Sequence, residues 1–417
     1  MADVDILSGA STDPGKRRSN NEDAVLEDPG RGLYIVADGM GGHACGEVAA
    51  RIAAESITRS MERIPDTPYL RDPSLANRQR IFDWLAVAVE EANTAILQTA
   101  QGDSKYRGMG CTLEVVVVRG LSGFFAHVGD SRAYILRGGD LTLLTEDHTM
   151  AQVLLAAGQI KPEELATHPK RNVLMRSLGN LPKVQVDMFF LELVPGDRVL
   201  LCSDGLHNEV APERLAAELG CADPRLAAKG LIQAALEGAA RDNVTALVVA
   251  VADRPVRRST TIGAVETRHA LMGSPLFGLL TEGELMRAQR IALERVLAPG
   301  ELVFSAGDPG DALYVVISGK LRVEQDGVGL GELGPGDHFG EMALIDDIPR
   351  SASVRAETAT RLIGFPRVEF EGLLGSDPAI TNKIQKRLLV SLSLRLRELN
   401  HQVAVYRKAL HVGMRQG

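Results

Sequence analysis

The chain has 417 residues, of which 45% are hydrophobic and 24% charged, and this composition indicates a globular protein of two or three domains. The formal net charge of −8 argues against a general affinity for nucleic acid, because such binding usually needs a basic surface. No apolar stretch approaches the roughly 18 residues of a membrane-spanning helix, and the N-terminus is acidic and then polar, unlike a signal peptide. The four cysteines have neither zinc-ligand nor paired spacing. We therefore expect a cytoplasmic protein with reduced thiols and without membrane or nucleic-acid partners.

The first part of the chain, up to about residue 253, predicts a mixture of strands and helices. Apolar runs such as "LYIVADG", "CTLEVVVVRG", "DRVLLCSDG" and "NVTALVVAVAD" are typical of buried strands. Residues 121–144 predict three short strands joined by tight turns. Helical periodicity is strong over 46–63, 78–100 and 224–240.

The pattern changes after this domain. Residues 254–275 have no apolar periodicity and are rich in Arg, Ser and Thr, which predicts a linker. From 276 to about 400, short strands alternate with closely spaced glycines, which is typical of a small antiparallel barrel or a jelly roll. The chain then ends in a predicted long helix, with residues 401–417 as its extension.

The terminal helix carries an apolar seam whose positions alternate in steps of four and three residues, as the a and d positions of a coiled coil do. The residues of this seam are Leu392, Leu396, Leu399, Val403, Tyr406 and Leu410. Two interpretations stay open: the helix packs on its own barrel, or it pairs with a second copy of the chain to form a homodimer.

Several carboxylates stand where predicted strands begin or end. Asp38 and Gly39 follow the strand in "LYIVADG"; the other carboxylates are Glu22 and Asp23 in "RSNNED", Asp204 in "LLCSDG" and Asp242 in "RDNVTALVV". One Asp-Gly pair is usually a plain turn, but four such segments in one domain favour a site for hard cations such as Mg²⁺ or Mn²⁺. Arg18, five residues before Asp23, adds a guanidinium whose shape suits a phosphate.

These segments, together with "VADGMGGHACGEVAA", "VGDSRAYILR", "TEDHT" and "RSLG", occur in the order found in metal-dependent protein phosphatases of the PPM (type 2C) class. Residues 8–253 most closely resemble the bacterial serine/threonine phosphatases. The resemblance implies a four-layer α-β-β-α sandwich with two metal ions, Mn²⁺ or Mg²⁺, between its sheets. Such a pair of cations can activate a water molecule for attack on phosphorus, so the implied reaction is hydrolysis of phosphoserine and phosphothreonine.

The resemblance also implies a role for each residue of the motifs. Asp38 would bridge both metals, and Gly39 would give its carbonyl oxygen to one of them. Asp204 and Asp242 would hold the other metal, and Glu22 and Asp23 would bind through water. Arg18 would grip the substrate phosphate, so the catalytic set is Arg18, Asp38 and Asp23.

Two positions depart from the pattern of the family. Met40 stands where many eukaryotic members have a histidine that serves as general acid; His43 could replace it or could be structural. A third metal in relatives uses two aspartates, of which Asp130 is present while the second position is Asn208. Because an amide binds cations more weakly than a carboxylate, a third site would be weaker here; Asp130 could equally be a turn residue.

The remaining histidines and the segment after "TEDHT" carry less signal. We expect His127 and His148 to be structural. Residues 149–180 match the mobile flap beside the active site of relatives, and we call them the flap segment. Its basic "HPKRN" either attracts phosphopeptides or is a solvated charge run.

The second domain carries its own signature in "FGEMALIDDIPRSASV". A cyclic nucleotide needs an arginine for its phosphate, a carboxylate for its ribose hydroxyl and N–H groups at a helix start, and Glu341 and Arg350 with the turn at Gly340 provide these. The stretch resembles the phosphate-binding cassette of cyclic nucleotide-binding domains, over residues 276–400. The predicted ligand-binding residues are Gly340, Glu341, Met342, Ala343, Arg350, Ser351 and Ala352. Ser351 does not distinguish cAMP from cGMP, and an unliganded structural barrel is the alternative.

The sequence therefore predicts an α+β protein, with a phosphatase domain followed by a β jelly roll and a long helix. The predicted function is a cytoplasmic serine/threonine phosphatase that is regulated by a cyclic nucleotide and acts on targets of a bacterial kinase. One alternative is a signalling scaffold with an inactive phosphatase fold. A transcription regulator would need a recognition helix, which this sequence lacks.

Overall fold

The computed structural model describes residues 5–41, 45–63, 75–252, 262–325, 327–344 and 349–393. The chain divides into two compact units, Met1–Ala264 and Val265–Gly417. Within the described ranges, no helix is both long enough and apolar enough to cross a membrane. The four cysteines all lie in these ranges and form no disulfide.

The first unit contains two antiparallel sheets. One sheet has the order β1-β11-β10-β7-β8, with β1 Ile6–Asp13, β7 Arg132–Arg137, β8 Asp140–Leu143, β10 Arg198–Cys202 and β11 Val244–Val251. The other has the order β2-β3-β5-β6-β9, with β2 Asp23–Asp28, β3 Leu33–Met40, β5 Leu113–Arg119, β6 Ser122–Val128 and β9 Asp187–Glu192. A short strand, β4 Gly110–Cys111, pairs with the end of β3. The three strands predicted over 121–144 are β6, β7 and β8.

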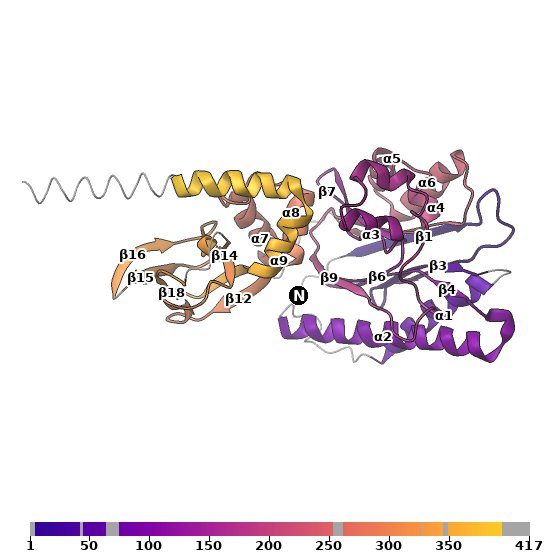
Figure 1. Cartoon of the computed structure of the whole chain (residues 1–417), viewed down its shortest axis with the longest axis horizontal. Helices are drawn as coiled ribbons and strands as arrows, with labels where there is room; N and C mark the ends of the chain where they lie inside the picture. The colour runs from indigo at the N-terminus through magenta and orange to yellow at the C-terminus, as the bar shows by residue number, and fades with distance from the viewer. Residues whose placement is uncertain are drawn as a thin grey trace, which may run out of the picture. The chain divides into compact units, whose positions relative to one another are not determined.

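Helices cover both outer faces of these sheets (Figure 1). On one side lie α1 Cys45–Glu62 and α2 Leu75–Gly102; on the other lie α4 Asp204–His207, α5 Pro212–Leu219 and α6 Pro224–Glu237. Helix α1 buries small side chains, among them Ala49, Ala50 and Ala53, so its backbone can approach the sheet closely. All eight residues of β11 are buried because they lie between the helices and the second sheet. The predicted α-β-β-α sandwich is confirmed.

The flap segment leaves the sandwich after β8 and returns before β9. It contains α3 Met150–Ala156 and a 3₁₀ helix, Pro162–Thr167. A second 3₁₀ helix, Ser104–Tyr106, follows α2.

The second unit is a sandwich of two four-stranded antiparallel sheets, which remain separate and do not close into a barrel. One has the order β12-β19-β14-β17, with β12 Leu293–Leu297, β14 Ala312–Ser318, β17 His338–Phe339 and β19 Thr360–Pro366. The other has the order β13-β18-β15-β16, with β13 Leu302–Phe304, β15 Leu321–Gln325, β16 Val328–Leu333 and β18 Ser353–Ala356. A 3₁₀ helix, Glu341–Leu344, follows β17.

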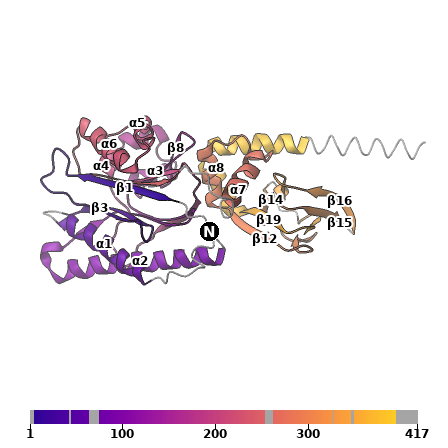
Figure 2. The same cartoon turned by 180° about the vertical axis from the view of Figure 1, so that it is seen from behind.

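Helices of the second unit precede and follow its strands (Figure 2). They are α7 Ile262–Gly273, α8 Glu282–Arg290, α9 Arg367–Ser376 and a final helix over 378–393. Their buried residues Leu271, Leu285 and Phe370 share one core with Leu313 and Phe365 of the first of these sheets. This core gives the second unit its own apolar interior.

Helix α7 corrects one boundary. The sequence assigns 254–275 to a linker, but residues 262–273 are helical. Ala270 and Leu271 of this helix are buried in the core of the second unit, so tertiary packing overrides the weak apolar periodicity. Of the apolar seam in the terminal helix, only Leu392 lies in the described residues; the other seam positions, like the extension 401–417, lie outside them.

Candidate metal centre and nucleotide-binding site

The carboxylates singled out in the sequence meet at one edge of the two sheets of the first unit. Asp38, near the end of β3, pairs in register with Asp23 at the start of β2. Asp204 follows β10 and begins α4, while Asp242 lies two residues before β11. Because β10 and β11 are adjacent strands, the last two carboxylates reach the same edge.

Burial and mutual repulsion change the acidity of this group. Burial, and then the charges of Asp23 and Asp204, raise the pKa of Asp38 well above its usual value. Burial also raises the pKa of Asp23, of Asp204 and, more weakly, of Glu22. The crowded carboxylates disfavour one another's ionised forms, and a bound cation would stabilise these ionised forms.

Asp23 gives a second test of whether a cation fits. Its Oδ2 accepts hydrogen bonds from Ser203 Oγ at 2.8 Å and from Thr245 Oγ1 at 2.6 Å. Its Oδ1 is buried and has no hydrogen-bond partner. Across the described ranges, no three His, Cys, Asp or Glu side chains form a ready-made metal cluster, so the fit rests on this burial, charge and unsatisfied oxygen.

Gly39 occupies a position that has no room for a side chain. A Cβ atom there would lie 2.2 Å from the carbonyl oxygen of Gly46 and 2.5 Å from that of Glu22. The backbone N–H of Gly39 donates to Glu22 O at 3.2 Å. The glycine therefore allows the end of β3, the start of α1 and the Glu22 segment to pack backbone against backbone. His43 lies outside the described residues.

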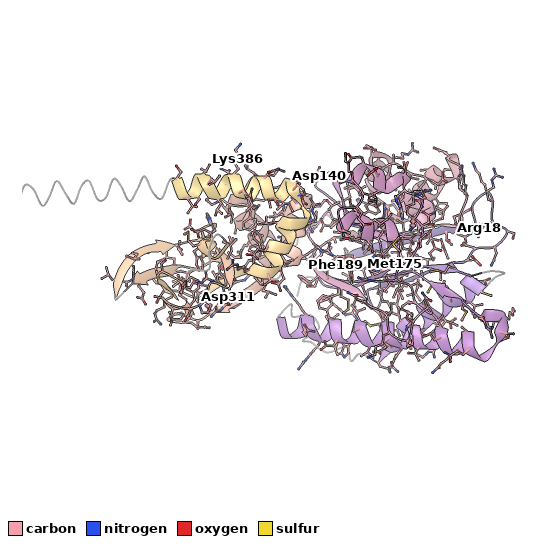
Figure 3. All side chains as sticks on the ribbon, in the orientation of Figure 1. Arg18, Asp140, Met175, Phe189, Asp311 and Lys386 are labelled. Carbon is pink, nitrogen blue, oxygen red and sulfur yellow. The ribbon has the colours of Figure 1, made fainter. Side chains whose placement is uncertain are left out.

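Arg18 reaches the same edge from the loop that follows β1 (Figure 3). Its Nη2 donates to Asp242 Oδ2 at 2.9 Å, and both side chains are partly exposed. This hydrogen bond and the charge of Asp242 raise the pKa of Arg18. The structure thus places the predicted phosphate-binding arginine directly beside a predicted metal ligand.

Asp130 lies in the turn between β6 and β7. Burial, and then the charge of Asp204, raise its pKa to about 7. Asn208 donates from Nδ2 to Asp204 Oδ2 at 3.2 Å, and His207 Nε2 lies 2.9 Å from the carbonyl oxygen of Asp130. Of the two positions of the predicted weaker third site, Asn208 is therefore hydrogen-bonded to Asp204, and Asp130 is affected by the charge of Asp204.

The sequence analysis did not identify two residues that hold this site together. Asn243 accepts the backbone N–H of Glu22 at 2.8 Å and donates to the carbonyl oxygens of Pro14 and Asn20. Thr112 Oγ1 accepts the backbone N–H of Asp38 at 3.0 Å. The pair "DN" in "RDNVTALVV" was the available signal for Asn243, whereas nothing in the sequence near Thr112 indicated its contact.

In the second unit, Arg350 is buried and makes only internal contacts. Its Nη2 donates to Ala312 O at 2.7 Å and to Asp311 Oδ1 at 3.1 Å, and its Nη1 donates to Gly340 O at 3.2 Å. The guanidinium carbon lies 4.2 Å from the centroid of the Phe304 ring. Phe304 is a further contact that the sequence analysis missed, because β13 is more than 40 residues from Arg350 in the sequence.

Of the other predicted nucleotide-binding residues, Gly340 contacts this arginine. Gly340 has a φ of +79°, and a Cβ there would lie 2.7 Å from Arg350 Nη1, so the turn needs glycine. Glu341 is buried and Met342 is half-exposed. The backbone of Ala343 belongs to the 3₁₀ helix, while its side chain lies outside the description. Ser351 and Ala352 connect Arg350 to β18.

Comparison with protein families assigns both units. The family described as Protein phosphatase 2C matches residues 15–237, more than half of the chain. The chain belongs to the protein phosphatase 2C family. The family described as Cyclic nucleotide-binding domain matches residues 294–377. Both resemblances noted in the sequence are thereby confirmed.

Two relatives of the phosphatase unit are bacterial proteins. The chain is 38% identical over 244 residues to the serine/threonine protein phosphatase PstP of Mycobacterium tuberculosis, covering 58% of this chain and 45% of PstP. It is 35% identical to the protein phosphatase PhpP of Streptococcus pneumoniae, covering 58% of this chain and 95% of PhpP. The chain thus spans less than half the length of PstP but nearly all of PhpP.

A solved structure adds information on metals. The catalytic domain of the serine/threonine protein phosphatase PstP in complex with two manganese ions is 35% identical and has a TM-score of 0.52. The match covers 60% of this chain and 99% of that one. The PstP catalytic domain therefore binds two Mn²⁺ ions on this fold.

His127 and His148 make contacts with residues other than the carboxylates that we assign to metal. His127 is buried against Glu114 and has the carbonyl oxygen of Glu146 at 2.9 Å from Nε2. His148 is buried and contacts Gly129 and Asp187. These contacts are consistent with the structural roles predicted for both.

A cavity of about 320 Å³ opens beside the end of β3. It is lined by Met40, Gly108, Met109, Gly110, Asn172, Leu174, Ser177, Gly179 and Asn180. The lining combines β3 and β4 with the flap segment and includes no charged side chain among these residues. Met40, which by the resemblance stands where many eukaryotic members have a histidine, is therefore part of a neutral surface next to Gly39.

Proposed function

We propose that this protein hydrolyses phosphoserine and phosphothreonine in proteins with two divalent cations, Mn²⁺ or Mg²⁺. The observation that carries the proposal is the convergence of Asp38, Asp204 and Asp242 at one sheet edge, with the unsatisfied Oδ1 of Asp23 beside them. Retention of all these carboxylates speaks against the alternative of an inactive scaffold.

Each residue would act from the position described above. Asp38 would bridge the cations, Gly39 would offer its carbonyl oxygen to one, and Asp204 and Asp242 would hold the other. Glu22 and Asp23 would act through water. When bound, the cations supply activation of the attacking water and neutralise charge on the phosphoryl oxygens.

Arg18 would bind the substrate phosphate. In the structure its guanidinium is paired with Asp242. A cation held by Asp242 would compete with Arg18 for this carboxylate, so the N–H donors of the guanidinium would be available for the phosphate. Occupation of the metal centre would in this way release the arginine for the substrate.

The substrate peptide would lie across the neutral cavity beside Gly39. Its lining of methionine, leucine, serine and asparagine side chains suits uncharged residues next to the phosphorylated one. The substrates would be proteins phosphorylated by a bacterial serine/threonine kinase in the cytoplasm. A third cation at Asp130 would bind more weakly, since Asn208 replaces the second carboxylate.

The second unit would regulate this activity by binding a cyclic nucleotide, cAMP or cGMP. Arg350 would bind the cyclic phosphate, Glu341 the ribose hydroxyl, and the backbone from Gly340 to Ala343 the remaining phosphate oxygens; Met342, Ser351 and Ala352 would complete the pocket. The domain boundaries remain those proposed from the sequence, 8–253 and 276–400, apart from the helical residues of the linker. A homodimer through the terminal helix would be the larger assembly.

One assay on the full-length chain tests both parts. Release of phosphate from a phosphothreonine peptide is measured with Mn²⁺ and with Mn²⁺ removed by chelation, each with and without cAMP or cGMP. We expect hydrolysis that depends on Mn²⁺ and changes with the nucleotide. A folded protein that binds Mn²⁺ but hydrolyses neither the peptide nor a chromogenic phosphate ester would favour the scaffold.

A further inference from the structure

His148 stands between the flap segment and the turn that carries Asp130. Its side chain is 6% exposed. Its Nδ1 accepts the backbone N–H of Gly129 at 3.1 Å, and its own backbone N–H donates to Gly129 O at 2.7 Å. Gly129 directly precedes Asp130, so His148 clamps this turn through two hydrogen bonds in opposite directions.

The same turn is connected to Asp38 on its other side. Ser131 Oγ and Thr112 Oγ1 are 2.6 Å apart. Thr112 Oγ1 accepts the backbone N–H of Asp38 at 3.0 Å, and the backbone N–H of Thr112 donates to Asp38 O at 2.8 Å. A displacement of the turn therefore reaches the backbone of Asp38 as well as Asp130.

On the flap side, His148 contacts an ion pair. Its Nε2 lies 3.2 Å from Asp187 Oδ2, and Arg176 Nη1 donates to Asp187 Oδ1 at 2.8 Å while lying 3.0 Å from the imidazole Nε2. The backbone N–H of Met175 donates to His148 O at 2.7 Å. Arg176 and Met175 both belong to the flap segment, so His148 is one of its anchors.

The protonation state of His148 follows from these contacts. Because Nδ1 accepts a backbone N–H, the neutral ring carries its proton on Nε2 and donates it to Asp187. Burial lowers the pKa of His148, which keeps the ring neutral. The ring thus joins two different partners. Nδ1 accepts the backbone N–H of Gly129 in the turn, and Nε2 donates to the carboxylate of Asp187, which also pairs with Arg176 of the flap segment.

We propose that His148 is a positioning residue that couples the flap segment to the turn carrying Asp130, so that flap position and cation affinity depend on each other. This rests on the proposed function for the identity of the metal centre. Coupling free energies are reciprocal. A cation must therefore change the equilibrium constant between the positions of the flap by the same factor by which flap position changes the affinity for the cation.

Two substitutions divide the histidine between its partners. His148→Asn keeps an acceptor at the place of Nδ1 for Gly129, but it is too short to reach Asp187. His148→Gln places its amide at the position of Nε2 and loses the acceptor for Gly129. Each variant keeps one half of the connection, so each should lose the coupling. If His148 had a purely structural role, the two variants would change only the stability of the protein.

Asp187→Asn and Arg176→Gln change partly exposed side chains and test the same connection where His148 variants fail to fold. His168→Asn is the matched control, because His168 also lies in the flap segment and its Nδ1 accepts only the local N–H of Lys170, at 3.2 Å. The readout is trypsin cleavage of the full-length protein after Lys170 and Arg171, which are exposed. Cleavage is followed with and without Mn²⁺, and Mn²⁺ binding is measured by titration calorimetry.

We expect Mn²⁺ to change the cleavage rate of the original protein and of His168→Asn by about fivefold or more, within the usual range of coupling. The response should be lost in His148→Asn, His148→Gln and Asp187→Asn, and their affinity for Mn²⁺ should fall. Variants that bind Mn²⁺ and keep the full response overturn the coupling but leave the proposed phosphatase untouched. A protein that binds no Mn²⁺ at all overturns the metal centre and the coupling together.

Discussion

The candidate metal centre of the first unit and the candidate nucleotide site of the second are built from opposite charges, and they differ in what surrounds those charges. At the metal centre, carboxylates crowd together, raise one another's pKa and leave Asp23 Oδ1 without a partner. In the candidate nucleotide site, Arg350 donates to two carbonyl oxygens and one carboxylate and lies over Phe304, while its Nε is buried and has no hydrogen-bond partner among the described residues.

This difference indicates how each site depends on its ligand. The carboxylates repel one another until a cation binds, so the metal-free protein should be less stable than the metal-bound protein. Nη1 and Nη2 of Arg350 already have partners within the protein, so a nucleotide that binds them would have to replace these contacts. The affinity of the second site for a nucleotide would therefore be reduced by the free energy of the hydrogen bonds that Arg350 loses on binding.

The largest expected effect comes from Asp38→Asn. It removes one charge from the crowded set and the proposed bridge between cations. Hydrolysis of a phosphothreonine peptide should fall by about 10³-fold or more, which corresponds to about 4 kcal/mol of lost transition-state stabilisation. The metal-free variant should nevertheless melt at a higher temperature than the original protein, because a buried repulsion is relieved.

Asp140→Asn is the matched control, since Asp140 is exposed on β8. It should leave both hydrolysis and melting temperature near their original values. If Asp38→Asn keeps near-normal turnover in a folded protein, or if it lowers the melting temperature of the metal-free form, the crowded-carboxylate account of the site is wrong.

Arg350→Ala should have the next largest effect, on binding of cyclic nucleotide. Loss of a buried charge contact with the ligand phosphate costs about 2–5 kcal/mol, or roughly 30- to 5,000-fold in affinity. Titration calorimetry with cAMP and cGMP on the full-length chain measures this change, and Arg322→Ala, at an exposed position of β15, is the control. Equal binding by Arg350→Ala and the original protein would remove Arg350 from the ligand site.

Much of the two sites could be predicted because the chemistry lies in short segments. Asp38 and Gly39 end a strongly apolar strand, and the glycine in "FGEMAL" precedes the 3₁₀ helix, so both turns are visible as local patterns. The four layers of the first unit were implied by a family resemblance that spans the whole domain. Local pattern and family together therefore pointed to the residues that we propose as functional.

The parts that could not be predicted depend on contacts between segments far apart in the chain. Asn243 fixes the Glu22 loop, and Phe304 lies on Arg350, although no local pattern joins either pair. Helix α7 has weak periodicity and is helical because Leu271 packs into the core of the second unit. In each case tertiary packing, rather than local propensity, determines the structure.

A smaller effect is expected from Asp311→Asn, which weakens the internal contact that the nucleotide must replace. The carboxylate of Asp311 is 77% exposed, so its ion pair with Arg350 is worth at most about 1 kcal/mol. Calorimetry should show nucleotide affinity tighter by up to about fivefold. Asp308→Asn, on the same exposed loop, should not tighten binding; weaker binding by Asp311→Asn would show that Asp311 supports the ligand instead of competing with it.

The smallest effect concerns Asp187, a carboxylate of the first unit with the opposite behaviour to Asp130. Hydrogen bonding by His148, and after it the charge of Arg176, lower the pKa of Asp187 to about 2, whereas burial raises that of Asp130 to about 7. A carboxyl group whose pKa is lowered on folding stabilises the protein at pH values above its pKa in the unfolded state, which is near 4. This contribution is lost as the pH falls toward the pKa of the folded state, about 2. Asp187→Asn should therefore be slightly less stable than the original protein at neutral pH. Its free energy of unfolding should be lower by less than about 1 kcal/mol, because the side chain is 42% exposed. The difference between the two melting temperatures should shrink between pH 4 and pH 2. A difference that stays constant over this range would mean that Asp187 supports the fold by shape and not by its charge, and the contrast between paired and crowded carboxylates would not hold for this unit.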